Sequence, residues 1–505
     1  MRKLAIGALI GLTAGLLSAP AAQADTPNKG PKIRLPQYVK VKDIRDHLQN
    51  LQTIARYNGG NRASGLPGGE ITVSYIADQL ERAGYDPKIQ HFTFPFWQEL
   101  SEPALEIVSP EQKSYEPEKD FLTYQYSGSG DVTATAAPVD TQSSTSGCEA
   151  SDFEGFPAGS IALIKRGSCT FEKKAANAVD AGATAVIIYN DGASDSRMGP
   201  VGGTLGRPFE VPVTGPSHPV GSHLVELANQ GELKLRIATD TLSEERTASN
   251  VIAETRRGRD GNVVMAGAHL DGVTSGPGIN DNGSGLATVL TIAEQIKRVP
   301  KLKNKVRFAF WGAEEEGLLG SQHYVDQLSK EQRDRIALYL NFDMVSSANY
   351  VRFVYDGDNS LGTGVDSPAG SGAIEQVLTE YYANHDMPTG EKPFNGRSDY
   401  GPFIAVGIPS GGLSSGSDGV KTEKQAEIYG GTAGKIYAPC YHSACDDIDT
   451  INWQAIEELS NGAAYGVERF ARSTLPVNGV ELAKQRAKSG NVKIKANRRG
   501  DRWVR

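Results

Sequence analysis

Three short apolar runs in the second half of the chain each end at an acidic residue or a histidine. The runs and the polar residues that follow them are Val263–Ala268 with His269, Phe308–Trp311 with Glu314, and Leu338–Phe342 with Asp343. Helix-like segments separate these runs, and such alternation is typical of an α/β sheet that contains parallel strands. Ligands bind to open α/β sheets outside the carboxyl ends of the strands. The sequence therefore predicts that these polar side chains converge on one crevice.

Histidine nitrogens and carboxylate oxygens are the side-chain atoms that bind zinc. Another carboxylate, that of Asp281, lies in the glycine-rich segment 278–285, where the backbone can wrap closely around an ion. The candidate ligands are His269, Asp281, Glu315, Asp343 and His442. Five ligands are too many for a single tetrahedral zinc that keeps an open position. Two metal ions that share one carboxylate fit better, because three carboxylates and one hydroxide would balance the charge of two divalent cations.

Residues 1–24 have the pattern of a secretory signal peptide. Arg2 and Lys3 precede an apolar run from Leu4 to Leu17, and the small residues Ala22 and Ala24 provide a cleavage site. The apolar run is shorter than the roughly 20 residues that span a bilayer. No later segment of the sequence is long and apolar enough to cross a membrane. We therefore expect cleavage after Ala24 and a secreted protein without a membrane span.

The mature chain is acidic, and its charge is unevenly distributed. Loss of Arg2 and Lys3 lowers the formal net charge from −8 to −10. The stretch Lys484–Arg505 carries +8, which leaves −18 for the rest of the mature chain. This tail contains few apolar residues, so we expect a solvated or proteolytically removed extension. Binding of the tail to cell-wall anions or nucleic acid is disfavoured because the rest of the chain would repel polyanions.

The four cysteines of an exported chain fit two local disulfides better than a metal site. Cys148 and Cys169 are 21 residues apart, and Cys440 and Cys445 are 5 apart. Other pairings stay open, because spacing alone does not determine connectivity. The shorter bridge would fix the backbone of Tyr441 and His442, which lie between its cysteines.

A chain of 505 residues is long enough for several domains. Between residues 128 and 239 the composition shifts to Gly, Ser, Ala and Val with short strand-like runs, which indicates an inserted module. The predicted organisation is a signal peptide (1–24), the N-terminal part of the main domain (25–127), the inserted module (128–239), the rest of the main domain (240–475) and a basic tail (476–505). The predicted helices are Val41–Ala55, Ile71–Ala83, Phe171–Ala181 and Leu286–Arg298, and the predicted strands are Ile89–Phe96, Ser160–Lys165, Ala183–Tyr189, Asn250–Glu254, Asn262–Ala268, Val306–Trp311 and Ile336–Phe342.

Four motifs in this order closely resemble those of the co-catalytic zinc aminopeptidases, the family of secreted bacterial leucine aminopeptidases and aminopeptidase Y. They are HLDGVTSGPGINDNGSG from His269, FWGAEEEGLLGS from Phe310, NFDM from Asn341 and CYHSACD from Cys440. The segment from Asn61 to Gly65 also resembles this family, and the stretch from Gly147 to Ile237 is similar to a protease-associated domain. The resemblance implies a three-layer α/β/α peptidase domain with a central mixed, largely parallel sheet, and a small β-rich protease-associated domain inserted into it.

The resemblance also implies a role for each candidate ligand. Asp281 would bridge two zinc ions, His269 and Asp343 would complete one site, and Glu315 and His442 would complete the other. Two zinc ions would lower the pKa of a bridging water and polarise the substrate carbonyl. The sequence does not support a calcium site, and a calcium requirement is left open.

Four further residues match positions that act on the substrate or on a ligand in this family. Glu314 matches the general base, and Tyr441 matches the phenol that stabilises the oxyanion. Asp271 matches the acid that orients the ring of His269. Arg397, in the segment 396–400, is similar to an arginine that contacts substrate in the secreted members.

The predicted function is therefore a secreted zinc aminopeptidase that removes the N-terminal residue of peptides and prefers large apolar residues. Its partners are peptide or protein N-termini, and the protein is expected to be a monomer. The alternatives on the same fold are a carboxypeptidase acting on acidic peptides, a glutaminyl cyclase with one zinc, and an inert peptide-binding ectodomain. An inert copy should have lost ligands, whereas this sequence has all of them. The inserted module shows no catalytic residues; its role is either structural or, as we prefer, to restrict access to the crevice or to bind part of the peptide.

One serine motif and six histidines are assigned no chemistry. Ser414 fits the pattern G-x-S-x-G, but no apolar helix follows it, so a serine-hydrolase nucleophile is not expected. A lone histidine is more often structural than a ligand. The histidines treated in this way are His47, His91, His218, His223, His323 and His385.

Overall fold

The computed structural model describes residues 33–194 and 197–479. The predicted signal peptide (1–24) and the basic segment from residue 480 onward lie outside the described residues. Among the described residues, no helix combines the length and the apolar character needed to span a bilayer.

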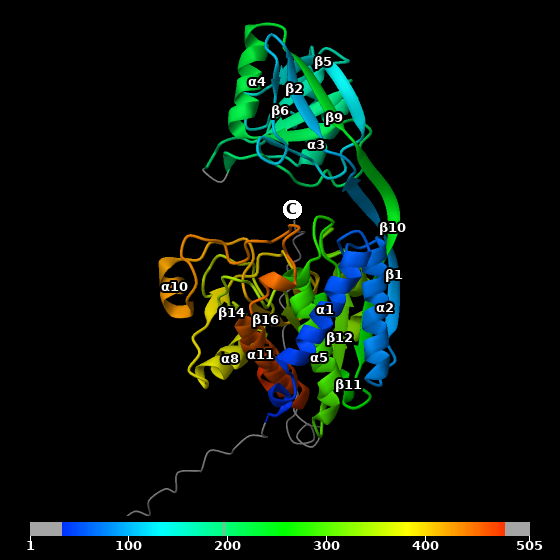
Figure 1. The fold of residues 1–505 in the computed structure, drawn as a ribbon, viewed down its shortest axis with the longest axis vertical. Helices are drawn as coiled ribbons and strands as arrows, with labels where there is room; N and C mark the ends of the chain where they lie inside the picture. The colour runs from blue at the N-terminus through cyan, green and yellow to red at the C-terminus, as the bar shows by residue number, and fades with distance from the viewer. Residues whose placement is uncertain (1–32, 195–196, 480–505) are drawn as a thin grey trace, which may run out of the picture. The chain divides into compact units, whose positions relative to one another are not determined.

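The main sheet has eight strands in the order β1-β10-β12-β11-β13-β16-β14-β15 (Figure 1). Its central strands β12, β11, β13 and β16 are parallel, whereas β1, β10 and β14 each run antiparallel to a neighbour. The strands are β1 (Lys88–Glu99), β10 (Thr241–Glu254), β11 (Arg259–His269), β12 (Asn304–Trp311), β13 (Ile336–Phe342), β14 (Phe353–Tyr355), β15 (Gly390–Lys392) and β16 (Ser410–Ser414). Every residue of β13 is buried, which explains why this central strand reads as one continuous apolar run.

Helices cover both faces of the main sheet. On one face, α1, α2, α5, α8 and α11 bury an apolar stripe against β11, β12 and β13. On the other face, α6 and α9 pack around Trp311 and Tyr339, and α7 contacts β11 and β13. The helices are α1 (Val41–Tyr57), α2 (Pro67–Arg82), α5 (Gly285–Gln295), α6 (Leu319–Asp326), α7 (Lys330–Arg335), α8 (Ser371–Ala383), α9 (Tyr400–Ala405), α10 (Glu423–Tyr429), α11 (Trp453–Arg472) and α12 (Leu475–Asn478), with short turns η1 (Leu35–Gln37), η4 (Ile279–Ser284), η5 (Ile296–Arg298) and η6 (Ile448–Thr450).

Helical spacing of apolar residues explains why the covering helices form. In α1, Ile44, Leu48, Leu51 and Ala55 recur every three or four residues, and all are buried. The longest helix, α11, begins at Asn452, whose side chain accepts a hydrogen bond from the backbone N–H of Ala455. The predicted three-layer α/β/α fold with a mixed sheet is therefore confirmed.

The second sheet also has eight strands, in the order β3-β2-β9-β5-β6-β7-β8-β4. Two helices pack on it, α4 with the core around Leu163 and α3 with the core around Ile164, so β6 is buried on both faces. Strands β2 to β4 precede Gly128, so this sheet takes in residues from both sides of that position. Its elements are β2 (Ala104–Ser109), β3 (Lys113–Ser114), β4 (Phe121–Thr123), β5 (Gly130–Val139), η2 (Ala150–Phe153), β6 (Ile161–Lys165), α3 (Phe171–Asp180), β7 (Ala185–Tyr189), β8 (Val213–Pro216), α4 (His218–Gln230) and β9 (Lys234–Thr239).

The two sheets are joined through β1 and β10. These strands pair antiparallel over the whole length of β1, from Lys88 opposite Ile252 to Glu99 opposite Thr241. The chain leaves the main sheet along β1 and returns along β10, as expected for an inserted module. Most predicted elements match observed ones within a few residues; for example, the strand expected at Ile336–Phe342 is β13 itself.

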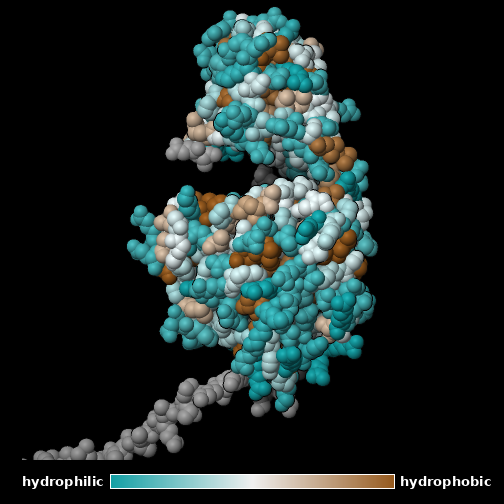
Figure 2. Space-filling model, in the orientation of Figure 1, coloured by the Kyte–Doolittle hydropathy of each residue, from teal (hydrophilic) through white to brown (hydrophobic). Residues whose placement is uncertain are grey.

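Both predicted local disulfides are present. Cys148 pairs with Cys169, and Cys440 pairs with Cys445. The face of the molecule in Figure 2 is largely hydrophilic, with hydrophobic residues in small separate groups.

Candidate metal centre and active site

The predicted ligands gather at the carboxyl end of the main sheet. His269 ends β11, Glu315 follows β12, and Asp343 follows β13. Because β11 runs parallel to both neighbours, these three residues emerge at the same edge. Asp281 comes from η4, and His442 comes from the loop between α10 and η6.

Asp281 lies between the two histidines. Its Oδ1 is 3.2 Å from His269 Nε2, and its Oδ2 is 3.3 Å from His442 Nε2. Each carboxylate oxygen therefore faces a different imidazole. This arrangement suits a carboxylate that is shared by two cations.

The remaining acids divide between the two histidines in the predicted way. Asp343 Oδ1 lies 3.4 Å from His269 Nε2, and Glu315 Oε2 lies 2.9 Å from His442 Nε2. The other Glu315 oxygen, Oε1, is buried without a hydrogen-bond partner among the described residues. A buried carboxylate oxygen without a donor has the character of a metal ligand. The residues present therefore fit two divalent cations.

In the protein without bound cations, the carboxylates of this cluster disfavour one another's charged form. Burial, followed by the charge of Asp281, raises the pKa of Glu315 to about 7. Burial also raises the pKa of Glu314 well above its usual range, and the nearby Asp399 and Asp343 add to this effect. For His442, burial lowers the pKa, but hydrogen bonds to Asp281 and Glu315 prevail and raise the pKa to about 10. Crowded carboxylates that hold protons in this way are an environment in which bound cations can replace those protons.

Glu314 faces the cluster without belonging to either pair. Its Oε2 is 4.0 Å from His269 Nε2, and the residue is buried. The backbone of Glu314 is held in place because Asp271 Oδ1 accepts a hydrogen bond from the Glu314 N–H at 3.4 Å. Asp271 also lies 3.5 Å from His269 Nδ1 through the same oxygen. Asp271 is thus placed to orient both the predicted ligand and the predicted base.

Two buried residues that the sequence did not single out hold the ligand-bearing loops. Arg62 is fully buried and donates to the carbonyl oxygens of Leu270, Pro277 and Gly278. Burial lowers the pKa of Arg62 to about 10. Arg62 therefore ties together the segments that follow His269 and precede Asp281.

Asp446 holds the same region from the other side. Its two carboxylate oxygens accept hydrogen bonds from the backbone N–H groups of Asn280 and Asp281, both at 2.9 Å. Asp446 stands next to Cys445, so the short disulfide anchors it as well as His442. Asp446 belongs to the CYHSACD motif, which was the available signal in the sequence.

Three positions beside the cluster have left-handed backbone conformations. The φ angles are +51° at Ala313, +54° at Met344 and +54° at His442. Such conformations are costly for residues other than glycine and persist where the surrounding structure fixes them. Each position carries or adjoins a predicted ligand or base, so the strain lies where side-chain direction matters most.

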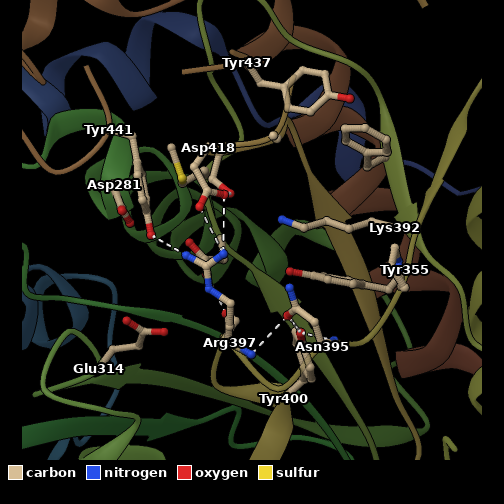
Figure 3. A pocket seen from close by; sticks show the side chains of 18 of the residues that line it. Asp281, Glu314, Tyr355, Lys392, Asn395, Arg397, Tyr400, Asp418, Tyr437 and Tyr441 are labelled. Atoms are coloured by element: carbon tan, nitrogen blue, oxygen red, sulfur yellow. Dashed lines mark hydrogen bonds and ion pairs between the residues drawn. The ribbon is translucent and has the colours of Figure 1, made fainter. Parts of the chain in front are cut away.

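A cavity of about 350 Å³ opens from the cluster (Figure 3). The Tyr441 ring stacks on the His442 ring with centroids 3.8 Å apart. Arg397 Nη2 lies 3.5 Å from the Tyr441 hydroxyl, and Arg397 Nη1 forms an ion pair with Asp418 at 3.1 Å. Tyr441 and Arg397 both line the cavity, as their predicted roles require.

The residues to which no chemistry was assigned have contacts within the fold. Ser414 is 1% exposed, and its Oγ accepts a hydrogen bond from Lys392 Nζ at 2.9 Å. Asp356, Asp358 and Glu375 form a separate acidic group, but each accepts hydrogen bonds from backbone N–H groups, so we assign no ion to it. The six other histidines contact neighbouring groups of the fold; they are His47, His91, His218, His223, His323 and His385.

An α/β sheet whose carboxyl edge gathers histidines and acids beside an open cavity defines a metal-dependent hydrolase. Residues 250–467 match peptidase family M28, and residues 130–224 match the PA domain. The chain is 44% identical over 478 residues to an aminopeptidase of Pseudomonas aeruginosa, covering 93% of this chain and 88% of that protein. It is 38% identical to a probable leucine aminopeptidase 2 of Aspergillus fumigatus, covering 88% of this chain and 86% of that protein. The chain therefore belongs to peptidase family M28 and carries a PA domain.

Solved structures agree with this assignment. An aminopeptidase from Aneurinibacillus sp. strain AM-1 has a TM-score of 0.68 at 26% identity, covering 87% of this chain and 95% of that chain. A zinc aminopeptidase from Bacillus subtilis has a TM-score of 0.61 at 25% identity, covering 87% and 98%. The predicted family, with its inserted protease-associated domain, and the predicted class of metallo-aminopeptidase are confirmed.

Proposed function

We propose that this chain is a secreted aminopeptidase that uses two zinc ions to hydrolyse the N-terminal peptide bond of peptides with large apolar N-terminal residues. The observation that carries the proposal is the position of Asp281, each of whose carboxylate oxygens faces a different histidine. His269 and Asp343 would hold one ion, and Glu315 and His442 the other. When bound, two zinc ions would lower the pKa of a water and polarise the substrate carbonyl.

The protein's own groups supply the remaining steps. Glu314 would accept a proton from the attacking water and return it to the leaving amine, a role worth about 10²–10⁴-fold in rate. Tyr441 would donate its O–H to the oxygen that gains charge, and Arg397 is placed to orient that hydroxyl.

The cavity supports removal of one residue at a time. The acids of the cluster would attract the free α-amine of the substrate, and the side chain of the N-terminal residue would then extend into the cavity. Aromatic walls formed by Phe353, Tyr355 and Tyr437 suit a large apolar side chain. The names of relatives such as the leucine aminopeptidase of Aspergillus fumigatus support the same preference.

Secretion is supported by the two disulfides, because such bonds persist mainly outside the reducing cytosol. The monomeric state stays a prediction. So do the proposed boundaries of the inserted module and its role in restricting access to the crevice.

Metal analysis combined with kinetics tests the proposal. The purified protein should contain two zinc ions per chain, lose activity toward leucine p-nitroanilide in a chelator, and recover it when zinc is restored. N-acetyl-leucine p-nitroanilide should not be cleaved, because its α-amine is blocked. Full activity after removal of all metal would refute the proposal. One zinc per chain with cyclisation of N-terminal glutamine would favour a glutaminyl cyclase, and release of C-terminal residues would favour a carboxypeptidase.

A further inference from the structure

Lys392 places a positive charge in the wall of the active-site cavity. It is the last residue of β15, and its Nζ points toward the middle of the cavity in Figure 3. Nζ donates a hydrogen bond to Ser414 Oγ at 2.9 Å and lies 5.7 Å from the centre of the Tyr355 ring. Both contacts are with uncharged groups, so they hold the ammonium in place without neutralising it.

Three other charged groups line this part of the cavity. Arg397 and Asp418 form an ion pair at 3.1 Å. Glu391 Oε2 accepts a hydrogen bond from Ser360 Oγ at 3.2 Å, and this contact leaves the charge of Glu391 in place. Within the part of the chain that the structure describes, no ion pair joins Lys392 to a carboxylate. Burial lowers the pKa of Lys392, whereas the charges of Asp343, Asp418 and Asp281 raise it. The ammonium of Lys392 therefore faces the cavity without a carboxylate in direct contact.

The position of this charge bears on the substrate's first side chain. In the proposed function, the scissile carbonyl and the α-amine lie at the metal cluster, so the N-terminal side chain is the part that reaches the cavity wall. A lysine or arginine there would bring a second cation close to Lys392, where screening by water is reduced. A side chain that ends in a carboxylate or an amide oxygen would instead meet a hydrogen-bond donor.

We propose that Lys392 is a specificity-determining residue that disfavours N-terminal lysine and arginine and admits N-terminal glutamate and glutamine beside the apolar residues. The inference rests on the proposed function, because it assumes that the cavity holds the N-terminal side chain. The aliphatic stem of Lys392 and the aromatic walls accept leucine or methionine. The ammonium of Lys392 discriminates between substrates by the charge at the end of their N-terminal side chain.

The test is a comparison of kcat/KM for leucine, methionine, glutamine, glutamate, lysine and arginine p-nitroanilides. Lys392→Met removes the charge and keeps a similar volume. In this variant, we expect kcat/KM for lysine and arginine to rise about tenfold relative to leucine, and that for glutamate to fall about tenfold. Lys392→Arg keeps the charge and should preserve the wild-type order of substrates.

The ratio of kcat/KM between substrates distinguishes an effect on selectivity from an effect on stability. If Lys392 only stabilised the fold, its substitution would change kcat/KM for all six substrates by the same factor. If its charge selects substrates, the substitution changes their order. Lys424→Met is the matched control, because Lys424 lies exposed on α10 and its loss changes the net charge equally. Lysine-to-leucine ratios in Lys392→Met within twofold of wild type would overturn the inference, and so would an equal shift in Lys424→Met.

Failure of the inference and failure of the proposed function give different results. If the zinc-loaded wild-type protein cleaves none of the six substrates, the proposed function is wrong. If it cleaves leucine p-nitroanilide and Lys392→Met leaves the order of substrates unchanged, only the role of Lys392 is wrong. Should Lys392→Met fold poorly, as judged by thermal unfolding, Lys392→Gln provides the same charge removal with a polar side chain.

Discussion

Both sheets of this molecule have eight strands of mixed direction, but the buried charged groups near them have different kinds of partner. At the carboxyl edge of the main sheet, acids and histidines face one another at 2.9–3.4 Å. In the second sheet's domain, the buried Lys174 donates to the backbone carbonyl of Ser146. Asn190 is likewise satisfied by Arg166 and by the carbonyl of Gly199.

The difference indicates where the protein requires something that it does not itself supply. Buried polar and charged groups normally find partners within the fold, as Lys174 of the second domain does. A cluster in which burial and nearby carboxylates raise the pKa of Glu314 and Glu315 is unfavourable unless cations join it. The comparison therefore assigns chemistry to one sheet and leaves the other domain a structural or access-controlling part.

The largest expected effect comes from Glu314→Gln, which removes the proposed base and keeps its shape. We expect kcat to fall by about 10²–10⁴-fold while both zinc ions remain bound. The measurement is kcat for leucine p-nitroanilide together with zinc content. Near-normal turnover would show that another group takes the proton.

Glu316→Gln is the matched control for this prediction. Glu316 belongs to the same run of three glutamates, but its Oε2 accepts a hydrogen bond from Gln125 at 2.7 Å. We expect kcat within about threefold of wild type, because this side chain has its own hydrogen-bond partner and no proposed role in the reaction. A loss as large as that of Glu314→Gln would mean that the whole run acts together.

A smaller effect is expected when a loop support is removed and the ligands are kept. In Asp446→Asn, one oxygen that accepts a backbone N–H becomes an amide group, so the segment that carries Asp281 loses a hydrogen bond. We expect zinc affinity to weaken by about 10–100-fold, as for other groups that orient metal ligands. Competition with a chelator measures this, and excess zinc should restore most of the activity.

Asp449→Asn provides the comparison for Asp446. Asp449 lies three residues further along the chain and is exposed. Its substitution should leave zinc affinity unchanged. The role assigned to Asp446 would be wrong if both variants bound zinc like the wild type.

The sequence predicted that His269, Glu315 and Asp343 would meet at one edge of the sheet, because these residues follow strands that can be recognised locally. Central strands such as β13 are buried throughout and appear as apolar runs, so the residue after each run marks the edge of the sheet. The resemblance to family motifs then assigned Glu315 as a predicted ligand and Glu314 as the predicted base, which periodicity alone does not do.

The supports and the cavity wall could not be predicted in the same way. Arg62 bonds to carbonyl groups 208 to 216 residues away, and a backbone carbonyl has no signature in a sequence. Lys392 lies in the three-residue strand β15, which is too short to show an alternating pattern. Such contacts depend on how distant segments pack, whereas the positions of His269, Glu315 and Asp343 depend on where single strands end.

The smallest effect on activity is expected in the second domain, from the double substitution Cys148→Ser and Cys169→Ser. The disulfide closes a loop across 21 positions, so its loss should lower the free energy of unfolding by about 3 kcal/mol in the chain-entropy model. Because the buried charges of this domain are satisfied within it, kcat for leucine p-nitroanilide should stay within about twofold of wild type at a temperature where the variant is folded. Denaturant unfolding measures the first quantity and steady-state kinetics the second. If kcat fell together with stability while zinc remained bound, the second domain would be contributing to the active site, and the contrast between the two sheets would fail.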